Sequence, residues 1–123
     1  MIIIGDKLVP FEEITYIKNV ENIKDSKANS IVMFNYDEKM LKYTYENELS
    51  SAVIVTSITE AIYCNSLNVK YIISEKHLAI QIQKIADNYM YDCKNLVIIN
   101  SNEEFEHIAK DEIDGVIYRD LIK

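Results

Sequence analysis

Glycine is nearly absent from this sequence, since 123 residues include only Gly5 and Gly115. Domains that bind nucleotides need glycines in the loop between a strand and a helix, where backbone amides approach the phosphates closely. Neither glycine stands in such a loop, and the sequence contains no GxGxxG or Walker A pattern. A conventional NAD or ATP domain is therefore disfavoured.

Cysteine and histidine are equally scarce. Cys64 and Cys93 are widely separated and belong to no CxxC motif, so we expect two small buried apolar side chains rather than a disulfide framework or a zinc site. His77 and His107 are the only histidines, and neither has a second histidine or a cysteine close by. We therefore expect no metal site and no cofactor.

Positive charge is in the minority. Thirteen Lys and Arg residues face twenty Asp and Glu residues, which gives a formal net charge of -7. A protein that neutralises phosphates needs the opposite balance, so nucleic acid is not an expected partner. No apolar run is long enough to cross a bilayer, and no basic segment precedes the apolar residues 1–4. We expect no membrane partner and a cytoplasmic location.

The sequence does contain a regular alternation of short apolar runs with segments of helical spacing. A helix is predicted from about 75 to 90, and others are predicted after Asp37, Ser57 and Ser101. Ser57 and Ser101 each begin a capping-box pattern, and Asp37 and Ser74 are further candidate N-caps. The apolar runs predict five strands, at 30–34, 52–56, 69–73, 96–99 and 115–118.

This alternation predicts one α/β domain over residues 1–123. Several strands are apolar at successive positions, which is typical of parallel strands with helices on both faces. We expect an open three-layer, mostly parallel five-stranded sheet over 30–123, which in outline resembles the Rossmann and flavodoxin folds. Residues 1–29 differ, because Gly5, Asp6 and Lys7 form a plausible turn between two apolar runs. An N-terminal β-hairpin or antiparallel edge strand is predicted there.

Ligands of open α/β sheets bind at the carboxyl ends of the strands, and the residues that follow each predicted strand are therefore candidates for a site. Arg119 is the only arginine of the chain, and its guanidinium group is suited to hold a carboxylate or a phosphate. A surface ion pair with Asp120 or Glu112 is the alternative. The candidate ligand-binding residues are Arg119, Asp37, Ser74, Glu75, His77 and Asn100, and Asn35 and Thr56 occupy equivalent places; the polar ones among them also suit helix capping.

Three hypotheses for function remain open, and the third is a relative of an enzyme domain that lost its chemistry and kept its fold, with which the missing glycines are compatible. The first is a non-enzymatic module that binds a protein partner or forms a homodimer, because the chain has nine tyrosines and no evident pairing of a nucleophile with a base. The second is a protein that binds a small anionic metabolite, or an enzyme, with Arg119 on the anion and Asp37, Glu75 or His77 in acid–base roles.

Overall fold

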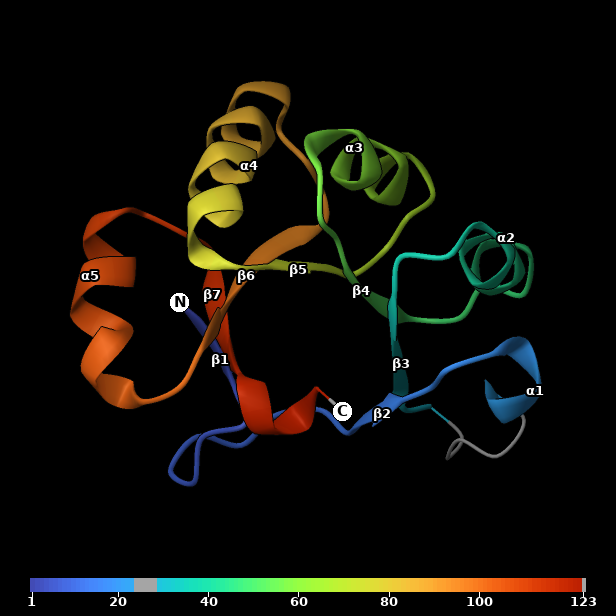
Figure 1. The fold of residues 1–123 in the computed structure, drawn as a ribbon, viewed down its shortest axis with the longest axis horizontal. Helices are drawn as coiled ribbons and strands as arrows, with labels where there is room; N and C mark the ends of the chain where they lie inside the picture. Colours follow the sequence, from blue (N-terminus) through green and yellow to red (C-terminus); the bar gives the residue numbers. More distant parts are fainter. Residues whose placement is uncertain (24–28, 123) are drawn as a thin grey trace.

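The computed structural model describes residues 1–23 and 29–122, and these residues form one curled, all-parallel sheet with helices along its outer side (Figure 1). The strand order within the described ranges is β1-β7-β6-β5-β4-β3-β2. The strands are β1 (Ile2–Ile4), β2 (Ile14–Tyr16), β3 (Ile31–Asn35), β4 (Ser51–Ile54), β5 (Tyr71–Ser74), β6 (Lys94–Ile99) and β7 (Gly115–Tyr118).

The helices begin where the capping residues predict. Asp37, Ser57 and Ser101 each accept a hydrogen bond from a backbone amide in the first turn that follows. Ser74 is not a cap, because Glu75 occupies the N-cap position and makes no side-chain capping bond. The helices are α1 (Val20–Ile23), α2 (Glu38–Glu46), α3 (Ile58–Ser66), α4 (Lys76–Tyr89) and α5 (Phe105–Lys110), with short 3₁₀ helices η1 (Asn102–Glu104) and η2 (Arg119–Leu121).

The parallel α/β architecture is confirmed, but the sheet has seven strands in the described residues and not five. Strands β2 to β7 follow one another in the sheet in chain order. Successive right-handed crossovers in one direction place their helices on one face. Figure 1 shows α2 to α5 along the convex outer side of the curl. The expectation of helices on both faces was therefore wrong. Strands that are apolar at successive positions predict burial of both faces, but they do not show whether helices or other strands bury each face.

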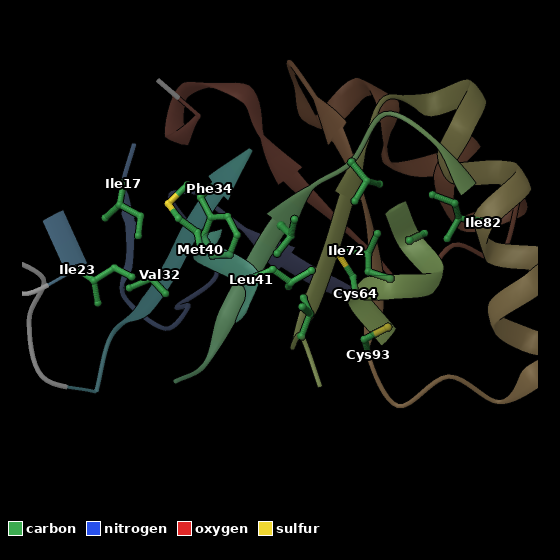
Figure 2. Packing of buried hydrophobic residues seen from close by; sticks show 14 residues of the cluster. Ile17, Ile23, Val32, Phe34, Met40, Leu41, Cys64, Ile72, Ile82 and Cys93 are labelled. Carbon is green, nitrogen blue, oxygen red and sulfur yellow. The ribbon is translucent and has the colours of Figure 1, made fainter. Parts of the chain in front are cut away.

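Two layers of buried side chains lie on opposite faces of the sheet. On the outer face, strand residues such as Val32 and Ile72 pack against helix residues such as Leu41 and Ile82 (Figure 2). Burial raises the pKa of both thiols in this layer to about 12, as expected of buried apolar cysteines. The full set of buried residues in this cluster is Ile17, Ile23, Val32, Phe34, Met40, Leu41, Val53, Val55, Ala61, Cys64, Val69, Ile72, Ile82 and Cys93.

On the inner face, the alternate residues of the strands pack against one another across the curl. No helix residue belongs to the buried members of this cluster, which are Ile4, Ile31, Met33, Ala52, Tyr71, Ile73, Leu96, Ile98 and Ile117. Leu121 and Ile122, in and after η2, pack against it. The curl therefore lets the inner face bury itself, in the way that the interior of a β-barrel is filled by its own side chains.

The predicted N-terminal hairpin is absent from the described residues. Strand β1 pairs in parallel with β7, and β2 pairs in parallel with β3, so residues 1–29 supply the two edge strands of the sheet. The alternative prediction of an added edge strand is therefore confirmed, but its antiparallel direction was wrong. Ile3 packs on an outer cluster, whereas Ile2 and Ile4 belong to the inner one. Because β1 is apolar on both sides, it is buried as a parallel strand rather than folded back as an exposed hairpin. Gly5 turns the chain after β1 with φ 98°.

A buried polar network under α4 was not anticipated from the sequence. Asn95, directly before the apolar run 96–99, donates to the carbonyl of Ala79 at 2.8 Å and to Gln83 Oε1 at 3.1 Å. Asp114 accepts from the Gln83 amide at 3.1 Å and from the Asn95 backbone at 2.9 Å. These bonds tie α4 to β6 and to the start of β7.

Gly115 marks the closest approach between β1 and β7. A Cβ atom at this position would lie 2.5 Å from the Ile2 carbonyl oxygen and 2.7 Å from Leu96 Cδ2. Backbone oxygen cannot yield as a flexible side chain can, so a side chain here would force the edge strand away from the sheet.

We expect Gly115→Ala to lower the free energy of unfolding by about 1–3 kcal/mol, the usual range for overpacking a core. Urea denaturation followed by circular dichroism measures the change, and Ser66→Ala, on the exposed side of α3, is the control. Equal stability of wild type and Gly115→Ala would contradict the close approach of β1 and β7.

Candidate functional site

Polar side chains gather at the carboxyl edge of the sheet, on the inner side of the curl. Residues two positions apart in a strand face the same side. Glu75, Asn100 and Arg119 each follow a buried inner-face isoleucine by two positions, namely Ile73, Ile98 and Ile117. Asn35 and Thr56 have the same relation to Met33 and Ile54, and Tyr16 is itself an inner-face residue. We call these six the carboxyl rim: Tyr16, Asn35, Thr56, Glu75, Asn100 and Arg119.

Three of the predicted site residues meet at the rim, at the ends of the adjacent strands β5, β6 and β7. Arg119 donates from Nη1 and Nη2 to the two carboxylate oxygens of Glu75, at 2.9 and 2.7 Å. Its Nε donates to Asn100 Oδ1 at 3.0 Å. All three guanidinium nitrogens are thus engaged, although about half of the Arg119 side chain is exposed to solvent. The predicted partners of an ion pair, Asp120 and Glu112, do not take part in these bonds.

The pair shifts the pKa of both partners. Hydrogen bonds from Arg119 hold the pKa of Glu75 below its ordinary value of 4.5. The same hydrogen bonds raise the pKa of Arg119, and the nearby charge of Glu104 adds to the effect. Asp6 and Tyr118, on the outer side of the same edge, form a second pair at 2.7 Å that raises the pKa of Tyr118 to about 12.

The far end of the rim is hollowed. Asn35 donates to Tyr16 Oη at 2.6 Å, across the ends of β3 and β2. A hollow of about 320 Å³ opens beside this contact, and its wall includes Lys18 and Asp37. A hollow of this size is at the lower end of the range for small-molecule sites.

Carboxylates behind the rim bond to its backbone. Glu60 accepts from the backbone amide of Thr56 at 2.9 Å, and Glu104 accepts from the backbone amide of Asn100 at 2.7 Å. Glu104 also completes the capping box that the sequence predicts at Ser101. These bonds fix the strand-to-helix turns that carry the rim residues. They also hold the carboxylates of Glu60 and Glu104 behind the rim, whose six residues include one cation, Arg119.

The other predicted site residues lie apart from the trio. Asp37 caps α2 through a hydrogen bond from the Met40 amide at 3.0 Å. His77 is exposed on α4 and bonds to Gln81, one turn along the same helix. Ser74 is buried, and its hydroxyl group has no hydrogen-bond partner. Since Ser74 follows the inner-face residue Ile73 in β5, its side chain faces the helices and not the rim.

Other classes of site find little support in the described part of the chain. No group of three or more His, Cys, Asp or Glu side chains there is arranged to hold a metal ion. None of the described helices has the length and apolarity needed to span a bilayer.

A larger hollow of about 1020 Å³ lies at the opposite, amino edge of the sheet, where Lys70, Tyr71 and Lys94 contribute to its wall.

Comparison with models of protein families and with curated proteins found no match for this chain.

The lowered pKa of Glu75 predicts a pH dependence of stability. A carboxyl group with a lowered pKa in the folded state stabilises the fold fully above its unfolded pKa, and this contribution disappears as the pH falls through the folded value. We expect Glu75→Gln to be less stable than wild type near neutral pH, and the difference to shrink as the pH falls below 4.5, the ordinary pKa of the group.

Urea denaturation across this pH range measures the difference. Glu106→Gln, which removes a carboxylate from the exposed pair with Lys110, controls for the change in net charge. A stability difference between Glu75→Gln and wild type that is constant with pH would show that the Arg119 contact does not hold in solution.

Proposed function

We propose that this protein is a small-molecule binding domain whose site is the carboxyl rim. One observation carries the proposal: Glu75, Asn100 and Arg119, from three adjacent strand ends, form a single hydrogen-bonded cluster. Parallel α/β sheets bind their ligands at this edge, because the loops after the strands are free to vary while the strands hold them in place.

The chemistry of the rim favours binding over catalysis. Its side chains are amides, hydroxyls, one carboxylate and one guanidinium, which donate and accept hydrogen bonds. No serine or cysteine nucleophile within the six rim residues stands beside a base.

A thermal-shift screen tests the proposal. We expect at least one class among sugars, sugar phosphates, dicarboxylates, amino acids and nucleotides to raise the melting temperature of the wild type. A ligand at a hundred times its Kd stabilises a protein by about 2.7 kcal/mol, which is a shift of several degrees for a small domain.

Asn100→Ala removes a rim contact and should abolish this shift, whereas Asn88→Ala, on the exposed end of α4, should retain it. If none of these classes stabilises the wild type at millimolar concentration, or if Asn100→Ala responds fully, the rim is not the binding site.

A second candidate function, self-association, is favoured by the open edge at β1. The backbone amide of Ile2 donates to the carbonyl of Asp114, on the side of β7. Backbone polar groups alternate between the two sides of a strand, so the amide and the carbonyl of Ile3 point to the unpaired side. A hollow of about 310 Å³ lies between β1 and residues 9–12, with the inner-face residues Ile31 and Tyr71 in its wall, and Leu8 and Phe11 nearby are exposed. Unpaired strand edges with apolar neighbours are sites at which another chain adds a strand. The partner we propose is a second copy.

Light scattering at micromolar concentration measures this association. We expect a dimer for the wild type and a monomer for Leu8→Lys, which places a charge beside the edge. Met90→Lys alters an equally exposed apolar residue at the end of α4 and should leave the dimer intact. A monomeric wild type, or a dimer lost only in Met90→Lys, would exclude the β1 edge as the interface.

A further inference from the structure

The ion pair at the rim restricts what the rim can bind. Glu75 and Arg119 satisfy each other through two hydrogen bonds, at 2.9 and 2.7 Å. A ligand that carries only a negative charge must displace Glu75 to reach the guanidinium group. It then leaves a carboxylate without its partner, next to the new anion, and like charges in contact repel.

The surroundings oppose a simple anion further. Glu104 contributes a negative charge near Arg119, and the chain as a whole carries a formal net charge of -7. A ligand that carries only a positive charge meets the opposite difficulty, because it must compete with Arg119 for Glu75. Neither kind of ion leaves every charged group of the rim paired.

We infer that the ligand of the carboxyl rim is a small zwitterion with an ammonium and a carboxylate on neighbouring atoms, the chemistry of a free α-amino acid. The ligand carboxylate takes the place of Glu75 against the guanidinium fork, whose geometry matches two carboxylate oxygens. The ligand ammonium donates to Glu75. One internal pair is exchanged for two pairs with the ligand, so no charge loses its partner.

Asn100 has a positioning role in this arrangement. Its Oδ1 accepts from Arg119 Nε at 3.0 Å, so the ligand carboxylate takes over only Nη1 and Nη2, the two nitrogens that donate to Glu75 in this structure. The backbone amide of Asn100 is held by Glu104 at 2.7 Å, which fixes the turn that carries it. The guanidinium plane is thereby oriented before a ligand binds, which lowers the cost in entropy of binding.

This inference rests on the proposed function, and calorimetry with three probes separates the two. The twenty standard amino acids are titrated singly into the wild type. The best binder is then compared with its analogue that lacks the amino group and with its analogue in which the carboxylate is an amide. We expect each analogue to bind at least roughly tenfold more weakly, because each loses one charge-assisted contact.

Glu75→Gln provides the sharpest test, because it removes the partner of the ammonium and frees the guanidinium group. We expect this variant to bind the amino acid roughly tenfold more weakly and the analogue without the amino group more tightly than the wild type does. Glu106→Gln, in the exposed pair with Lys110, should change neither affinity.

Three results would overturn the inference in different ways. If the wild type binds the analogue without the amino group as tightly as the amino acid, the rim is a simple anion site and the binding function stands. If no amino acid binds and none of the other ligand classes raises the melting temperature, the binding function itself fails. A loss of both affinities in Glu75→Gln, while circular dichroism shows that the variant is folded at the temperature of the titration, would also contradict the exchange of pairs.

Discussion

Burial of the inner face of the sheet is the constraint on which the rest of the structure depends. Strands β2 to β7 lie side by side in chain order, so their helices cover only the outer face. The inner face carries isoleucines, leucine and methionine that water would otherwise reach. Curling brings these side chains together, and Leu121 and Ile122 add to the same cluster. The hydrophobic effect therefore favours the curl as well as the helix packing.

The site follows from the same curl. A flat sheet would present the ends of its strands in a line, whereas a curled sheet turns them toward a common centre. The inner-face alternation that buries Ile73, Ile98 and Ile117 continues by one more step to Glu75, Asn100 and Arg119. Along each of these strands, the inner-face residues are thus apolar in the interior and polar at the carboxyl end.

Much of this was accessible from the sequence, because apolar runs and capping residues are local signals. Strands β3 to β7 lie within a few residues of the predicted positions, and three of the four predicted caps hold. The strand order was not accessible, since the apolar stripe of a helix is the same whichever face it covers. Strand β1 was misjudged because three isoleucines do not reveal a partner that lies more than a hundred residues away, at Gly115.

The candidate site was predicted in part for the same reason. Glu75, Asn100 and Arg119 were recognised from their places after strands, but their contact depends on the order β5-β6-β7. Ser74 and Glu75 differ by one position and therefore face opposite sides, a distinction that needs the register. Asn95 had a usable signal, since a buried amide in an apolar strand requires partners. No local signal marked Tyr16 as a site residue, because its contact with Asn35 depends on the pairing of β2 with β3.

The pairing of β1 with β7 also bears on how the chain folds. Strands β2 to β7 each find a neighbour among segments close in sequence, so they can assemble in turn as synthesis proceeds. Strand β1 is made before all of them, yet its partner is the strand that is made after all of them. The contact at Gly115 thus closes the longest loop in the molecule and carries the largest cost in chain entropy. Until that loop closes, the three isoleucines of β1 lack their partner strand, and these apolar side chains are open to contact with other chains.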